Sequence, residues 1–183
     1  MVLLFLGRIH QKKGIELLLE AMNTLRANHD NLHLLIVGTG DSSYVNEIQS
    51  LIKRLQISNS VTMLGMVEES IKIEILRGSD VFLCPSYGEN FGISVIEAAA
   101  VGLPIITTNK VAVAKTLGLS GAAIVTDCNA IEISNAIERL AGDEQLREKM
   151  KIAGINIVEK EFSLSSMAEK IQSTYPLLIN NLI

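Results

Sequence analysis

Residues 80–108 read DVFLCPSYGENFGISVIEAAAVGLPIITT, and this stretch decides the fold. It begins with an apolar run at 80–85, passes through a polar loop, and enters an apolar helical pattern at 92–102. A second apolar run follows at 104–108. Two short apolar runs on either side of a helical pattern predict two buried strands joined by a helical crossover, which is the repeating unit of a parallel sheet.

The same alternation continues over most of the chain. Further strands are predicted at 2–6, 32–38, 61–65 and 122–126. Further helices are predicted at 14–27, 44–56, 68–78 and 130–141, with a short helical segment before the last strand. Continuous apolar strands joined by helical crossovers predict a doubly wound, Rossmann-like α/β fold with about six parallel strands and helices on both faces. In such a sheet ligands bind beyond the carboxyl ends of the strands.

The C-terminal part of the chain departs from this alternation. Two helical segments, 143–162 and 163–183, follow each other with no strand between them, and Ser163 is the predicted N-cap of the second. We therefore divide the chain into a Rossmann-like domain, 1–162, and a C-terminal helix, 163–183. The second segment is expected to pack on the sheet's edge or to reach toward another domain.

Composition narrows the possible partners. The 183 residues are 48% hydrophobic and carry a net charge of −4, which gives no electrostatic case for nucleic acid or an anionic membrane as the main partner. Two cysteines are too few for a disulfide scaffold or a zinc site, and Cys84 lies in an apolar run where burial is expected. No secretory signal or run long enough for a membrane span is seen, so a cytoplasmic protein is expected.

Two cations follow the first predicted strand, in GRIHQKKG (7–14). Gly7 permits close approach of the backbone to a ligand, and Arg8 and Lys13 would lie at the ligand edge near the start of a helix. Cations beside a helix N-terminus suit a phosphate group, although a solvated charged loop would read the same way. His10 in this loop could touch a ligand or be solvated, whereas His29 and His33 are expected to be surface or structural residues.

Two glycines follow the second predicted strand, in VGTGDSS (37–43). The stretch begins like a dinucleotide fingerprint, but Ser43 stands where the third glycine would be, and the motif follows the second strand rather than the first. We interpret Gly38 and Gly40 as a tight strand-to-helix turn, which disfavours a nicotinamide dehydrogenase.

The loop and helix of the opening stretch carry two carboxylates, Glu89 and Glu97. The free backbone N–H groups at the helix start, those of Phe91, Gly92 and Ile93, would face the ligand edge and favour an anion. Glu97, near the second turn, could accept hydrogen bonds from a pair of hydroxyls, as acidic residues do with a ribose. Glu89 could meet another polar part of the same ligand. Apolar neighbours of Glu97 leave little room for the alternative of a wide solvent-facing stripe.

No pattern for metal or nucleophilic catalysis accompanies these residues. There is no Asp-x-Asp pair to hold a divalent cation on a diphosphate, so cationic side chains and helix N–H groups would have to neutralise it. No metal and no cofactor are therefore predicted. No Ser/His/Asp or Cys/His arrangement stands out either.

Taken in order, GRIHQKKG, VGTGD, LGMV and residues 79–108 resemble the C-terminal domain of group 1 glycosyltransferases of the GT-B type. Glu89 and Glu97 match the E-x7-E motif of that family, and the resemblance covers essentially the whole chain. It implies transfer of a sugar from a nucleotide-sugar donor, with retention of anomeric configuration and without a required metal. The donor would be a UDP-, GDP- or ADP-sugar; base, sugar and acceptor are left open, as is a role in polysaccharide biosynthesis.

The resemblance also assigns roles to positions of this chain. Arg8 and Lys13 would hold the donor diphosphate and stabilise it as the leaving group, with Gly7 allowing close approach. Backbone groups of Phe91, Gly92 and Ile93 would add to that, and Glu89 would bind the donor sugar. Glu97 would bind the ribose, and the base would pack on the turn at Gly65, Met66 and Val67. Asn90 stands where the family often has Gly or Ser, which should be tolerated because the backbone makes the contact.

One departure from the family is large. Its enzymes have two Rossmann-like domains, and the N-terminal one carries the acceptor site. That domain is expected to be absent from this chain, so the chain alone should be inactive as a transferase, and 163–183 would be the segment that crosses to it. The full-length protein is expected in the cytoplasm, with peripheral association at the inner membrane face as an alternative. Competing functions are a sugar-nucleotide epimerase or phosphorylase of the same architecture, and a non-catalytic nucleotide-binding module.

Overall fold

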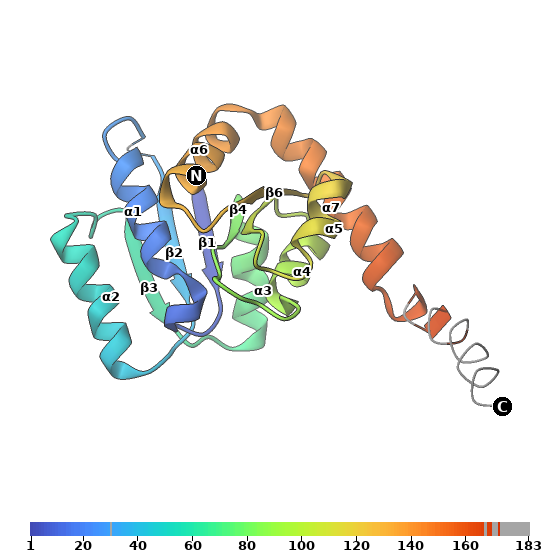
Figure 1. Cartoon of the computed structure of the whole chain (residues 1–183), viewed down its shortest axis with the longest axis horizontal. Coiled ribbons are helices and arrows are strands. Elements are labelled where there is room, and N and C mark those ends of the chain that lie inside the picture. The colour runs from blue at the N-terminus through green and yellow to red at the C-terminus, as the bar shows by residue number, and fades with distance from the viewer. Residues whose placement is uncertain (30, 167, 170–171, 173–183) are drawn as a thin grey trace.

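The fold is a six-stranded, wholly parallel sheet with helices on both faces (Figure 1). The computed structural model describes residues 1–29, 31–166, 168–169 and 172. The strands are β1 Val2–Leu6, β2 His33–Val37, β3 Val61–Gly65, β4 Val81–Cys84, β5 Ile105–Thr108 and β6 Ala123–Thr126. Their order, β3-β2-β1-β4-β5-β6, is that of a doubly wound dinucleotide-binding sheet, so the predicted fold class and all six predicted strands are confirmed.

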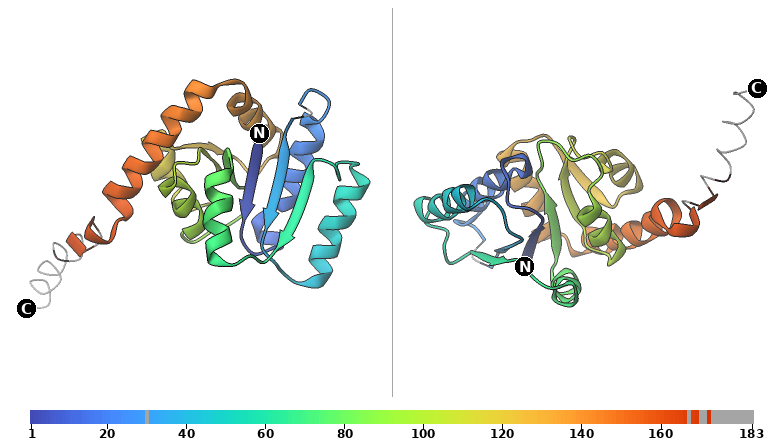
Figure 2. Two further views of the ribbon diagram at one scale, coloured as in Figure 1. Left: turned by 180° about the vertical axis from the view of Figure 1, so that it is seen from behind. Right: turned by 90° about the horizontal axis from the view of Figure 1, so that it is seen from below.

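Two helical layers enclose this sheet. The helices are α1 Ile15–Leu25, α2 Ser42–Arg54, α3 Glu69–Gly78, α4 Ile93–Ala100, α5 Ala114–Ser120, α6 Ala130–Gly142 and α7 Glu144–Phe162. One face packs against α1, α2 and α6, and the other against α3, α4, α5 and α7. Figure 1 shows the molecule from the side of α1 and α2, and the left view of Figure 2 shows it from the side of α3 and α7.

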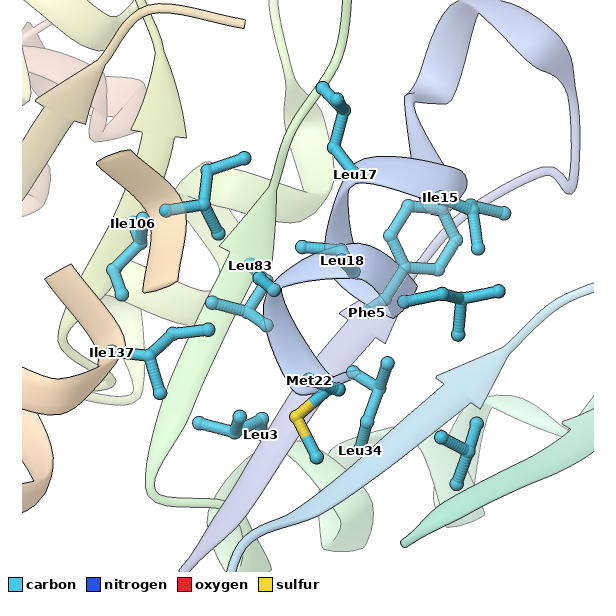
Figure 3. Close-up of a cluster of buried hydrophobic side chains, with 14 of the residues drawn as sticks. Leu3, Phe5, Ile15, Leu17, Leu18, Met22, Leu34, Leu83, Ile106 and Ile137 are labelled. Atoms are coloured by element: carbon cyan, nitrogen blue, oxygen red, sulfur yellow. The ribbon is translucent and has the colours of Figure 1, made fainter. Parts of the chain in front are cut away.

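Alternation along each strand divides the core into two clusters. Leu3 and Phe5 of β1 face α1, where they meet Leu18 and Met22 (Figure 3), whereas Leu4 lies in the cluster on the opposite face. All five are at most 2% exposed, so burial on both faces explains why the strands read as continuous apolar runs rather than as alternating ones.

Local signals set where several helices begin. The side chain of Asp41 accepts a hydrogen bond from the N–H of Ser43 (2.9 Å) and starts α2. Asn129 caps α6 through the N–H of Ile131 (2.8 Å), and Asp143 caps α7 through the N–H of Leu146 (2.8 Å). In contrast the N-cap residues of α1 and α4 are Gly14 and Gly92, and neither glycine can supply a side-chain cap.

Helix α7 lies across α4 and α5 and extends past the edge of the body (Figure 1). A Cβ at Gly154 would lie 3.1 Å from the carbonyl oxygen of Ala99, so the glycine lets α7 approach the backbone of α4 closely. The predicted helix at 143–162 is confirmed. Ser163 accepts a hydrogen bond from the N–H of Ser166 (3.2 Å), as an N-cap does, but most of the predicted helix at 163–183 lies outside the described residues.

The first loop differs from the prediction in one respect. Lys13 does not start the long helix but ends a short 3-10 helix, η1 Gln11–Lys13, and α1 begins two residues later. The ring nitrogen Nδ1 of His10 accepts a hydrogen bond from the N–H of Lys12 (3.1 Å) and so caps η1.

Among the described residues no helix is both long enough and apolar enough to cross a membrane.

Candidate functional site

The strand order places a topological switch point between β1 and β4. The chain leaves β1 toward β2 on one side and leaves β4 toward β5 on the other, and a crevice at the carboxyl ends of such strands is where doubly wound sheets bind ligands. A cleft of about 720 Å³ opens there. Its walls include Gly7, Arg8, Met66, Val67, Ile93 and Glu97. These six are predicted site residues that come from three separate parts of the chain: the loop after β1, the turn after β3 and helix α4.

The remaining predicted residues lie beside this cleft rather than in its walls. Glu89 and Asn90 line a neighbouring hollow of about 660 Å³ together with Lys110 and Lys115. Ile93 lines the first cleft, so the segment 89–93 forms the boundary between the two hollows. Phe91 and Gly92 belong to this boundary segment, and Lys13 reaches it from η1.

Close packing of two loops forms the floor of the cleft. The N–H of Gly7 donates to the carbonyl of Val37 (3.0 Å), and the N–H of Ile9 donates to that of Thr39 (2.9 Å). A Cβ at Gly38 would lie 1.9 Å from the carbonyl oxygen of Gly7, and φ there is +134°, which side chains rarely adopt. The glycines of VGTGD therefore serve contact between loops, in agreement with a tight turn.

Lys13 and Glu89 form an ion pair at the boundary segment. Both side chains are about three-quarters buried. The hydrogen bond from Lys13 lowers the pKa of Glu89, and the nearby N–H groups of Phe91 and Asn90 act in the same direction. The backbone of Glu89 is also anchored, since its N–H donates to the carbonyl of Lys110 (3.1 Å) and its carbonyl accepts from Ala112 (3.0 Å).

Helix α4 starts at the boundary segment with Gly92, whose φ is +90°. The carbonyl of Gly92 accepts the N–H groups of Val95 (3.0 Å) and Ile96 (3.2 Å), so the helix is formed from its first turn. No side chain caps it, and the first N–H groups remain available at the edge where the cleft opens. An N-terminus of this kind favours an anion.

Glu97, one turn further along α4, is also paired with a lysine. Nζ of Lys72 lies 2.9 Å from Oε1 of Glu97 and 2.7 Å from Oε1 of Glu69. Hydrogen bonds to these two carboxylates raise the pKa of Lys72, and the bond to Glu69 has the larger effect. Lys72 lines the cleft and was not predicted as a site residue. Its i,i+3 spacing from Glu69 is visible in the sequence, but its contact with Glu97 depends on how α3 and α4 pack.

Arg8 and Met66 are exposed side chains in the walls of the cleft. Arg8 is exposed, and within the described part of the chain its guanidinium makes no ion pair or hydrogen bond. Met66 is 78% exposed in the turn after β3, where the carbonyl of Gly65 accepts the N–H of Gly38 (2.8 Å). The cleft thus combines a free cation, an apolar turn, a helix N-terminus and two lysine-paired carboxylates.

His29 and His33 lie away from the cleft. His29 pairs with Glu138 (3.3 Å), and His33 bonds the hydroxyl of Thr62 (2.8 Å), so both have structural partners as predicted.

A hollow of about 840 Å³ between α1 and α2 is lined by Tyr44 and Tyr87. It is larger than the cleft but contains neither carboxylate of the E-x7-E pair. No group of three or more metal-ligating side chains occurs in the described ranges.

Both the sequence and the fold of this chain resemble those of known proteins. Residues 1–157 match the family described as glycosyl transferases group 1. A phosphatidyl-myo-inositol mannosyltransferase of Mycobacterium leprae is 30% identical over 177 residues, which cover 94% of this chain and 45% of that protein. The chain therefore spans less than half the length of this curated relative.

Two solved structures share the fold. The crystal structure of the C-terminal domain of a group 1 family glycosyl transferase from Francisella tularensis superposes with a TM-score of 0.80 at 21% identity, covering 89% of this chain and 86% of that one. The Anabaena protein HepE, solved in complex with UDP, superposes with a TM-score of 0.86 at 21% identity, covering 96% of this chain and 48% of that one.

Proposed function

We propose that this chain, which belongs to the group 1 glycosyl transferases, is the donor-binding part of an enzyme that transfers a sugar from a nucleotide-sugar to an acceptor. The observation that carries the proposal is the placement of Glu89 and Glu97. They flank the uncapped N-terminus of α4 at the switch point of the sheet, and each is paired with a lysine.

The donor would lie along the cleft in three parts. The base would pack on the exposed turn at Met66 and Val67, and the ribose hydroxyls would donate to Glu97. The diphosphate would lie over the N–H groups of Phe91, Gly92 and Ile93, beside Arg8, whose guanidinium has no partner among the described residues. The sugar would then reach Glu89 on the far side of the boundary segment.

The chemistry asked of this chain is stabilisation of a leaving group. When the bond between the sugar and the diphosphate breaks, negative charge develops on the terminal phosphate oxygens. The N–H groups at the start of α4 are held by the helix before reaction, and Arg8 and Lys13 would bring positive charge to the same place. Stabilisation of the developing charge is the dominant contribution in such reactions. We propose that these groups act without a metal and, from the resemblance to the family, that the anomeric configuration is retained.

Acceptor recognition is proposed to lie outside this chain. The curated relative is more than twice as long as the matched region, and the donor cleft here opens at a single sheet edge. We expect the chain alone to bind the donor but to transfer sugar at a negligible rate. The full-length protein is proposed to act in the cytoplasm, free or peripherally associated with the inner face of the membrane.

The direct test is calorimetric titration with UDP-, GDP- and ADP-glucose. One of them should bind at concentrations below about 1 mM, which corresponds to about 4 kcal/mol. Arg8→Ala and Glu97→Ala should each weaken binding about tenfold or more, because each removes a charge-assisted hydrogen bond. Lys12→Ala, the exposed cation of η1, is the matched control and should bind as the unmodified chain does.

Two outcomes would reject the proposal. Failure of all three donors to bind would remove the donor site, and equal binding by the Arg8 and Glu97 variants would show that the assigned residues are wrong. Incubation with donor alone, followed by product analysis, separates the transferase from an epimerase, since an epimerase would change the donor sugar without an acceptor.

A further inference from the structure

Helix α7 contacts the boundary segment through a pair of aromatic rings. The ring centroids of Phe91 and Phe162 lie 6.0 Å apart with an interplanar angle of 77°, which is the favoured edge-to-face arrangement. Phe91 belongs to the segment whose N–H groups are proposed to hold the diphosphate, and Phe162 is the last residue of α7. The two residues are far apart in sequence, and the contact was not predicted.

Phe91 lies in the least supported part of that segment. Glu89 is anchored through its backbone to Lys110 and Ala112, and Gly92 is anchored as the start of α4. Between these anchors Asn90 and Phe91 are exposed, and in the described part of the chain neither makes a backbone–backbone hydrogen bond. Their N–H groups instead face the carboxylate of Glu89 within the same segment, and the ring contact with Phe162 is a restraint on Phe91 that comes from outside the segment.

Phe162 is itself attached to a firm support. Ile157, Val158 and Phe162 pack on the core cluster beneath α4, and Gly154 brings α7 close to the backbone at Ala99. Helix α7 therefore holds the last ring in a fixed place relative to α4, the helix that begins at Gly92.

We propose that Phe162 is a positioning residue for the diphosphate-binding N–H groups of Phe91 and Gly92. It would touch neither the donor nor the reacting atoms and would act through the ring of Phe91. The inference rests on the proposed donor function, since it deepens the role of the same segment. An aromatic pair of this kind corresponds to a change of about two- to tenfold in the population of the ordered segment.

The first test uses the ligand-free chain. Amide hydrogen exchange and line widths at Asn90, Phe91 and Gly92 are measured by NMR in Phe162→Ala and Phe162→Tyr. The alanine variant should exchange about two- to tenfold faster at these amides, and the tyrosine variant, which keeps a ring, should restore the original rates. Unchanged exchange in Phe162→Ala would overturn the proposal.

Val158→Ala provides the control for simple loss of stability. Val158 lies one turn earlier on α7 and packs on the same core cluster. Its truncation should lower the melting temperature without changing the amides of the boundary segment. If Val158→Ala changes these amides as much as Phe162→Ala does, the effect is one of general packing and the proposal is wrong.

The second test separates diphosphate from nucleoside. UDP, GDP and ADP are each compared with uridine, guanosine and adenosine by NMR titration. Phe162→Ala should weaken diphosphate binding about two- to tenfold and leave nucleoside binding unchanged. Equal losses for both ligands would overturn the proposal. If the unmodified chain binds no nucleotide, the donor function fails, and amide exchange still decides whether Phe162 holds the segment.

Discussion

Nζ of Lys72 lies 2.9 Å from Oε1 of Glu97, so a lysine of α3 holds the carboxylate that α4 presents to the cleft. This ion pair is partly buried. Lys72 has a second partner, Glu69, which lies on the same helix and outside the cleft walls. A carboxylate restrained in this way is oriented toward a ligand before the ligand arrives, and preorganisation of this kind lowers the cost of binding.

Lys72→Met should therefore weaken nucleotide binding about five- to tenfold. The substitution keeps the aliphatic bulk but removes the charge-assisted hydrogen bond that orients Glu97, and such a bond contributes about 1.5–3 kcal/mol at most. Calorimetric titration measures the effect. Glu69→Gln removes the other partner and leaves the contact with Glu97, so it should bind nearly as the unmodified chain does. Equal losses in both variants would argue against orientation of Glu97.

Glu89→Gln should strengthen binding of the diphosphate part of the donor and weaken binding of its sugar part. Lys13 is paired with Glu89 in the ligand-free chain, so losing the carboxylate frees a cation for the diphosphate and removes a nearby negative charge. Nucleoside diphosphate should bind about two- to fivefold more tightly, on the scale of a partly screened charge interaction. The nucleotide-sugar should lose the contact between Glu89 and its hydroxyls. Weaker binding of the bare nucleoside diphosphate would contradict this account.

The same ion pair predicts a pH dependence of stability. Lys13 lowers the pKa of Glu89 below its ordinary value of 4.5, so the folded chain binds this proton less readily than the unfolded chain. The stabilisation is thus present above about pH 4.5 and is lost as pH falls through the lowered pKa. The melting-temperature difference between the unmodified chain and Glu89→Gln should shrink over that range. A difference that widens in acid would refute the assignment, and Glu74→Gln, an exposed position, is the control.

Gly38→Ala should destabilise the fold by about 3 kcal/mol or more, because its Cβ would overlap a backbone carbonyl at a strained φ. Gly78→Ala, at the end of α3, meets no atom within 4 Å and should stabilise by about 0.5–1 kcal/mol. Urea unfolding measures both free energies. A mild effect at Gly38 would mean that the loops after β1 and β2 can separate, and the floor of the cleft would then not be rigid.

The strands could be predicted from sequence because burial on both faces of the sheet gives continuous apolar runs, whereas the strand order that creates the switch point was not predicted. The carboxylate spacing of Glu89 and Glu97 was equally visible, since both residues belong to one loop and helix. The 3-10 turn at Gln11–Lys13 was missed because three residues carry no periodicity and the cap from His10 is local to that turn.

Contacts between distant elements could not be predicted in the same way. Lys72 reaches Glu97 across two helices, and Phe162 reaches Phe91 only because α7 packs on α4. Neither contact follows from the properties of its own segment. The contact between the Gly7 and Gly38 loops could be predicted only in part, since the glycines indicate close approach of the backbone without identifying the partner.

Amide chemical-shift mapping of the chain during titration with UDP, GDP and ADP tests the central claim most directly. We expect one nucleotide to perturb the amides of Gly7, Arg8, Met66, Phe91 and Gly92 together, since these residues would surround one donor. Perturbation centred instead on the hollow lined by Tyr44 and Tyr87, with the amides of Phe91 and Gly92 unchanged, would contradict the proposed donor site.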